Sequence, residues 1–208
     1  MQHLINICEK YAAKYELTFN VKKTKGMCFK PKSLSKLNIP VITLNRQQIE
    51  FVSSHVYLGV VIQDSYIDNL DLGRQTKSIY GRGNILIKKF AICDDTVKVK
   101  LFKAYCSSFY CSQLWSSYCS VSYRKLKTSY NRIVRNLFKL ERECSISAKC
   151  IELNIDCFEV VIRKSIFSFR SRLFASDNVI LQSLCSCDYF YHSNLTKCWN
   201  NLLFKFNV

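Results

Sequence analysis

The sequence predicts an α+β chain in which one helix and a few small antiparallel strands precede an all-helical bundle. The first observation behind this prediction is a change of apolar period near residue 65, from short strand-length runs to a sustained helical spacing. The second is the composition, because 49% of the 208 residues are hydrophobic and can fill a core. The third is that no apolar run approaches the ~20 residues needed to span a bilayer.

Residues 1–64 combine one helical stripe with strand-like runs. Apolar side chains recur at helical spacing over residues 2–16, at Leu4, Ile7, Cys8, Tyr11 and Tyr15. Strand-forming runs follow at 17–20, 26–30, 41–44, 49–52 and 56–62. Pro31 and Pro40 bracket a Ser/Lys-rich loop, since proline resists continued strand pairing. An amphipathic helix followed by small antiparallel strands is therefore expected.

From Asp68 onward the apolar period is helical. Four stripes step by three and four residues, at 72–90, 97–118, 126–140 and 158–173. Short polar connections between them predict a bundle in which each helix buries its stripe against the others. A fifth helix is expected over 194–204. Residues 65–142 would form the first part of this bundle and residues 143–208 a helical extension.

The chain is strongly basic, with 31 Lys and Arg against 15 Asp and Glu and a net charge of +16. Such an excess predicts association with a polyanion, usually nucleic acid and less often an anionic membrane. A solvated basic surface without a partner is the alternative. The N-terminus lacks the layout of a signal peptide, so we expect a soluble intracellular protein of the nucleus or cytoplasm, without membrane contact. Its 12 cysteines are then expected to be reduced and mostly buried.

The basic residues concentrate in two places. Between Glu16 and Glu50 there is no acidic residue but there are six lysines, Lys22, Lys23, Lys25, Lys30, Lys32 and Lys36. On the third helical stripe, six basic residues lie off the apolar positions: Arg124, Lys125, Lys127, Arg132, Arg135 and Lys139. A cationic helix face near Tyr123 and Tyr130 suits phosphate contacts and base stacking. A solvated helix face fits the same pattern equally well.

Two motifs in the first region carry a resemblance to a known family. Asn20-Val-Lys-Lys23-Thr24 follows the first helix, and Val56-Tyr57-Leu58-Gly59-Val60 comes later. In order and spacing they resemble the palm segment after the catalytic hairpin in reverse transcriptases of non-LTR (LINE-type) retrotransposons. There, an Asn-x-x-Lys-Ser/Thr element precedes a Tyr/Phe-Leu-Gly turn, the primer grip. Residues 80–115 are similar to the helical region that follows the palm.

The resemblance covers most of residues 2–142. It implies that residues 1–64 are the C-terminal part of a palm and 65–142 a thumb. It also implies that the chain is the primer–template-binding, C-terminal part of an RNA-directed DNA polymerase, with RNA and DNA as partners. Mg²⁺ and deoxynucleoside triphosphates would be bound only in the intact parent enzyme.

The resemblance also implies roles for single residues. Lys23 matches the family lysine that stabilises the leaving pyrophosphate in the intact parent, whereas an ordinary surface lysine is the plainer alternative. Tyr57, Leu58 and Gly59 match the primer grip, where glycine permits a tight turn or a close backbone approach. A buried strand and its turn would also explain these three. Further nucleic-acid contacts are expected from Lys22, Lys25, Arg124, Lys127, Arg132 and Arg135.

The carboxylates that hold the metal ions of this family are absent. They lie in an aromatic-Ala-Asp-Asp turn and on an earlier strand, and the sequence carries neither, so we expect no polymerase activity from this polypeptide alone. Asp94-Asp95 is the one Asp-Asp pair. It lies between two helical stripes, where an aspartate accepts free helix N–H groups, so it is interpreted as a helix cap.

The C-terminal region contains a possible zinc-binding arrangement. Cys185, Cys187, His192 and Cys198 are similar to the CCHC knuckles of some retrotransposon proteins, and three thiolates with one imidazole could bind Zn²⁺. The first pair is separated by one residue instead of two, and the glycines of a knuckle are missing. A packed, metal-free segment is therefore favoured, and no metal ligand is assigned.

Two further functions stay open. The chain could be a non-catalytic basic protein that binds nucleic acid with strong salt dependence. It could also be the inert remnant of a decayed element. In that case exposed strand edges and apolar surface would favour aggregation.

Overall fold

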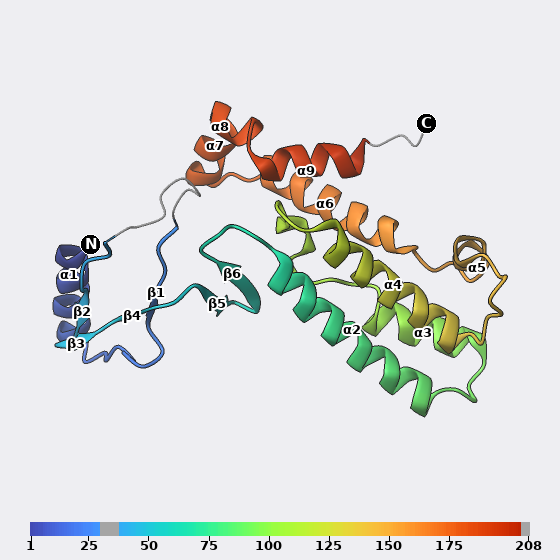
Figure 1. The fold of residues 1–208 in the computed structure, drawn as a ribbon. Helices are drawn as coiled ribbons and strands as arrows, with labels where there is room; N and C mark the ends of the chain where they lie inside the picture. Colours follow the sequence, from blue (N-terminus) through green and yellow to red (C-terminus); the bar gives the residue numbers. More distant parts are fainter. Residues whose placement is uncertain (30–37, 205–208) are drawn as a thin grey trace. The chain divides into compact units, whose positions relative to one another are not determined.

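A computed structural model describes residues 1–29 and 38–204 of the chain (Figure 1). It is a mixed α+β structure, mostly helical with a few very short strands, which confirms the predicted class at this level. The chain divides into two compact units, residues 1–67 and 68–208. The boundary expected after residue 142 falls inside the second unit.

The first unit begins with α1 (Gln2–Lys14), two residues shorter than the predicted helix. Glu16 adopts a left-handed backbone with φ 55°. The N–H of Leu17 then donates to the carbonyl of Ala12, and that of Glu16 to Ala13, at 2.9 and 3.3 Å. This pair of hydrogen bonds closes a helix end and turns the chain away. The strand predicted over 17–20 is therefore wrong.

The apolar stripe of α1 faces outward. Leu4, Ile7, Cys8, Tyr11 and Tyr15 are all exposed, and Ala12 is the one buried residue of the helix. The opposite side attaches to the next strand through Gln2, whose side-chain amide both donates to and accepts from the backbone of Thr43 at 2.9 Å. The helix is thus held by polar contacts, and its apolar face stays exposed among the described residues of the first unit.

Within residues 1–29 and 38–67, the strands form three separate pairs. β1 (Lys25–Gly26) pairs with β4 (Glu50–Phe51), β2 (Thr43–Leu44) with β3 (Gln47–Gln48), and β5 (Ser54–Tyr57) with β6 (Val60–Gln63). The last two pairs are antiparallel, but β1 and β4 are parallel, so the expectation of antiparallel strands throughout is wrong. The run predicted as one strand over 56–62 is broken by a turn at 58–59. Lys30, Pro31, Lys32 and Lys36 lie outside the described residues.

The second unit is helical. Its elements are α2 (Asn69–Lys89), α3 (Asp95–Tyr105), the 3₁₀ turn η1 (Ser112–Leu114), α4 (Ser120–Leu137), α5 (Ile146–Glu152), α6 (Phe158–Phe174), α7 (Val179–Cys185), α8 (Asp188–Tyr191) and α9 (Asn194–Leu203). The stripes predicted at 72–90, 126–140, 158–173 and 194–204 correspond to α2, α4, α6 and α9. The short helices α5, α7 and α8 were not anticipated, because none is long enough to show a period.

The helix predicted over 97–118 is wrong beyond Tyr105. α3 ends there, and Cys111 has a left-handed φ of 61° before the 3₁₀ turn. The side-chain amide of Gln75 on α2 donates to the Tyr110 carbonyl at 2.9 Å. Polar groups of α2 therefore hold residues 106–119 as a loop, although their apolar spacing continues that of α3.

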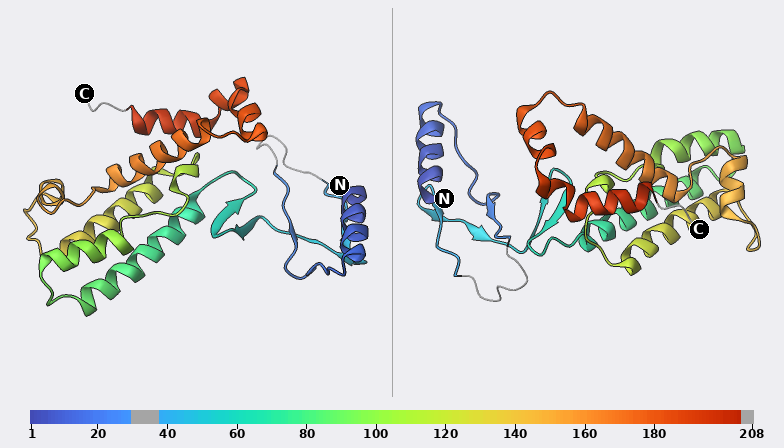
Figure 2. Two further views of the ribbon diagram at one scale, coloured as in Figure 1. Left: turned by 180° about the vertical axis from the view of Figure 1, so that it is seen from behind. Right: turned by 90° about the horizontal axis from the view of Figure 1, so that it is seen from above.

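Buried side chains from all parts of the second unit form one core. An aromatic group lies at its centre, where the ring of Tyr130 on α4 contacts those of Phe102, Phe109 and Phe158 at centroid distances of 5.3–6.0 Å. α2 and α4 run side by side in both sets of views (Figures 1 and 2). Within the described residues, no helix is both long and apolar enough to cross a membrane.

Candidate nucleic-acid interface

The predicted primer-grip residues form the tip of a hairpin. Tyr57 pairs with Val60, so Leu58 and Gly59 make a two-residue turn, with φ 47° and 79°. Positive φ at both central positions defines the turn that matches the twist of paired strands. Tyr57 is 60% exposed and Leu58 74% exposed. Two large apolar side chains are thus held outward on a tight turn. The alternative of a strand and its turn is confirmed, since Tyr57 ends β5, but the expected burial is wrong.

The second predicted motif forms a turn after α1. The Asn20 side-chain oxygen accepts the N–H of Lys23 at 3.2 Å, and the Asn20 carbonyl accepts the Thr24 hydroxyl at 3.0 Å. The side chains of Lys22 and Lys23 are exposed. Lys25 instead forms an ion pair with Glu50 beside it in the β1–β4 ladder. The motif therefore exposes Lys22 and Lys23, whereas the lysine that follows it, Lys25, is used in the ion pair with Glu50.

Positive charge in the second unit is concentrated on two helices. From residue 68 onward there are 22 Lys and Arg against 11 Asp and Glu. Ten of the 22 basic residues lie on α2 and α4. Of the 11 acidic residues, one lies on these two helices, Asp71. The remainder of the unit is nearly balanced, with 12 basic and ten acidic residues. The contribution of α2 to this positive charge was not predicted from the sequence, because the five basic residues of α2 are spread among apolar and small residues.

The predicted cations of α4 differ in their partners. Lys127 forms an ion pair with Glu159 on α6. Arg135 donates to the backbone carbonyls of Glu141 and Cys144, and so fastens the loop after the helix. Arg124 and Arg132 are exposed and form no ion pair with another described residue. Arg124 and Arg132 are thus the better placed of the four to meet an external phosphate.

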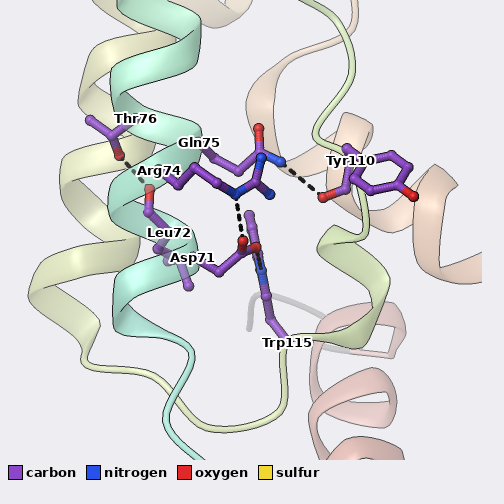
Figure 3. Close-up of polar contacts among 7 residues, drawn as sticks. All are labelled: Asp71, Leu72, Arg74, Gln75, Thr76, Tyr110 and Trp115. Carbon is purple, nitrogen blue, oxygen red and sulfur yellow. Dashed lines mark hydrogen bonds and ion pairs between the residues drawn. The ribbon is translucent and has the colours of Figure 1, made fainter. Parts of the chain in front are cut away.

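A buried carboxylate fixes the start of α2 against the loop that leads into α4 (Figure 3). Asp71 accepts the indole N–H of Trp115 at 2.9 Å and the guanidinium of Arg74 at 2.7 Å. Its side chain is fully buried, while that of Arg74 is 30% exposed. A buried charge is tolerated when it is paired and hydrogen-bonded in this way. The one acidic residue on α2 or α4 is therefore neutralised inside the protein.

Two neighbouring side chains bring the starts of α2 and α4 together. The Asp68 carboxylate accepts the N–H groups of Ser116 and Ser117 at 2.8 and 2.9 Å. Burial raises the pKa of Asp68, against the lowering effect of these two hydrogen bonds. Asn69 accepts the N–H of Cys119, the residue before α4, at 2.8 Å. Because both N-termini are tied at one end, α2 and α4 run parallel.

The residues considered for metal binding are not brought together. Cys198 contacts the Tyr118 hydroxyl at 3.7 Å, Cys185 is buried, and Cys187 and His192 are exposed. Over residues 1–29 and 38–204, no group of three or more His, Cys, Asp and Glu is placed to hold a metal ion. Asp94 accepts the N–H of Val97 at 2.8 Å, which confirms the helix cap.

Comparisons with known proteins add no relative: no protein-family model, curated protein or solved structure matches the chain.

Proposed function

We propose that the chain is the primer–template-binding part of a reverse transcriptase of the non-LTR retrotransposon type, without its catalytic aspartates. In this proposal residues 1–64 derive from the palm, and the helices that follow derive from the thumb and an extension. The chain binds RNA and DNA. Chemistry, with Mg²⁺ and nucleoside triphosphates, belongs to the intact parent, where Lys23 would face the leaving pyrophosphate.

The observation that carries the proposal is the exposed hairpin tip. Tyr57, Leu58 and Gly59 come in the expected order after the Asn20–Thr24 turn, and the hairpin holds two apolar side chains in solvent. A left-handed conformation at a leucine is costly and is kept where the surroundings or a function require it. Contact with a primer strand is a function that would keep Leu58 in this conformation.

The test is binding of the full chain to an RNA template annealed to a shorter DNA primer, compared with a blunt duplex. Tyr57→Ser is expected to weaken binding to the recessed primer end more than binding to the blunt duplex. Tyr11→Ser is the matched control, because Tyr11 is 61% exposed and lies in the same unit. Equal effects of both substitutions on both substrates would reject the role of the hairpin. Primer extension by this polypeptide with Mg²⁺ would reject the proposed lack of catalysis.

A second candidate is a non-catalytic nucleic-acid-binding protein that needs no polymerase parent. The concentration of cations on α2 and α4 favours it, since this feature is independent of the palm-like motifs. The two candidates differ in the coding sequence upstream. An in-frame aromatic-Ala-Asp-Asp segment there favours the polymerase, and continuous genomic sequence without one favours the separate binding protein.

An inert remnant is the third possibility, and the outward apolar stripe of α1 is the surface that would make such a remnant aggregate. A single cooperative thermal transition in a monodisperse sample would argue against it.

A further inference from the structure

A groove runs between α2 and α4 near their tied N-terminal ends. It has a volume of about 320 Å³ and is lined by Asn69, Gly73, Thr76, Lys77, Tyr80, Ser122 and Lys125. The two lysines are exposed, and Tyr80 is half-buried. A Cβ added at Gly73 would meet nothing within 4 Å, so the glycine leaves this part of the groove open.

We call the line between α2 and α4 that extends this groove the seam. On α2, the lining residues Gly73, Lys77 and Tyr80 are followed at helical spacing by Asn84 and Lys88, on the same side. On α4, Lys125 is followed two turns later by Arg132. Because the helices are parallel and packed along their length, these positions extend the same two rims. We call Lys77, Lys88, Lys125 and Arg132 the seam cations.

The seam cations are available for a partner. None of the four forms an ion pair with another residue among 1–29 and 38–204. All four are exposed. Lys77 and Lys125 line the same groove, so their like charges repel each other. No acidic side chain on either helix offsets this repulsion, since Asp71 is buried and already paired.

We propose that the sugar–phosphate backbone of one nucleic-acid strand lies along this seam. Phosphates would contact the seam cations, and a sugar or base would lie against Tyr80 in the groove, the combination of charge and aromatic surface used for strand binding. Lys77 and Lys88 are separated by ~16 Å along the helix. That distance corresponds to roughly five base-pair steps along the axis of a duplex, at about 3.4 Å each. The inference rests on the proposed function, and it adds Lys77 and Lys88 of α2, which were not predicted from the sequence, to the cationic face of α4.

The first test compares two double variants of the full chain that lose the same charge. Lys125→Gln with Arg132→Gln removes two seam cations, and Lys100→Gln with Lys103→Gln removes two exposed cations of α3. Affinity is measured by fluorescence anisotropy against single-stranded RNA, single-stranded DNA and an RNA–DNA duplex, which separates the possible sources of the strand. The seam variant is expected to bind on the order of tenfold more weakly at moderate salt, with a shallower salt dependence. The α3 variant is expected to bind almost as wild type.

The second test changes shape without changing charge. Gly73→Leu fills the groove, and leucine is a better helix former than glycine, so the variant is expected to fold. Ser78→Leu adds an apolar side chain to an exposed position of α2 outside the groove. Gly73→Leu should weaken binding several-fold and Ser78→Leu should not. General attraction by net charge would leave both variants unchanged.

The outcomes separate this inference from the proposed function. If wild type binds but both double variants weaken equally, the seam is rejected while nucleic-acid binding stands. If wild type binds no nucleic acid, the proposed function fails and the seam with it. Poly-glutamate is included as a competitor at equal charge concentration. Full displacement by it would reject the strand in favour of an acidic protein partner.

Discussion

Gly83 on α2 lies directly against the side chain of Ile133 on α4. A Cβ on Gly83 would lie 2.6 Å from both Cγ1 and Cδ1 of Ile133, and 2.8 Å from its Cγ2. Both residues are buried. The absence of a side chain at this one position therefore sets how closely the two most basic helices approach each other, and thus where the seam between them lies.

Gly83→Ala is expected to destabilise the fold. Overpacking a core typically costs about 1–3 kcal/mol, which exceeds the gain of up to about 1 kcal/mol from replacing a helical glycine. Gly81→Ala on the same helix has open space and should be stabilising. Urea unfolding of both variants measures the difference. A Gly83→Ala protein as stable as Gly81→Ala would contradict this packing.

The hydrogen bond from Trp115 to Asp71 is expected to contribute to stability. Trp115→Phe removes the indole N–H and leaves the buried carboxylate with one partner fewer, which should cost about 1.5–3 kcal/mol beyond the loss of ring contacts. A double-mutant cycle with Asp71→Asn isolates the pair. A coupling energy near zero in denaturant unfolding would mean that the two side chains do not interact as described.

Helix positions in the second unit could be predicted from sequence because each long helix repeats its apolar residues over four or more turns. Asp94 could be assigned as a helix cap because its partner is local: the free N–H of Val97 lies three residues further along the chain. The break at Cys111 could not be predicted in the same way. Its cause is a set of hydrogen bonds from α2, about 35–45 residues away in sequence, which the local period does not contain.

The candidate site was predicted only where it depends on local sequence. The hairpin tip at Tyr57–Gly59 is local and follows from a short motif, although its exposure does not. The cations of α4 were visible as a dense group. Which of them are free depends on distant partners such as Glu159 for Lys127, and the contribution of Lys77 depends on the parallel packing of α2 and α4.

Cysteine reactivity should follow burial. Burial raises the pKa of Cys106 to about 11 and that of Cys150 to about 12. Thiolates are the reactive form, so at pH 8 these two should react with a disulfide reagent far more slowly than exposed Cys8, Cys119 and Cys187. Mass spectrometry of partly labelled protein gives the order. Early labelling of Cys106 in folded protein would contradict its burial.

The raised pKa of Cys106 also predicts a loss of stability in alkali. Its folded pKa of about 11 exceeds the ordinary value of 9.0, so the thiol ionises first in the unfolded chain. Its contribution is complete below pH 9 and is lost as the pH rises from 9 towards 11. Unfolding midpoints measured across this range should fall less steeply for Cys106→Ala than for wild type. Identical slopes would rule out this contribution.

Leu58→Asn is expected to separate stability from binding. Asparagine tolerates the left-handed conformation that Leu58 adopts at φ 47°, and Asn-Gly is the preferred sequence for this turn. The substitution should therefore stabilise the hairpin by up to about 1 kcal/mol. It also removes an exposed apolar side chain from the proposed primer contact, so binding to a recessed primer end should weaken. Calorimetry and anisotropy on the same samples measure both effects, and tighter binding by the variant would contradict the proposed contact.

The central claim is that this chain binds nucleic acid through phosphate contacts, and its salt dependence tests that claim most directly. The affinity of the full chain for an RNA–DNA duplex is measured between 50 mM and 300 mM salt, concentrations chosen to span roughly the range over which counterion release is seen. Contacts by about four seam cations predict a slope of log affinity against log salt near −3 to −4. A slope near zero, or no binding at the lowest salt, would contradict the account.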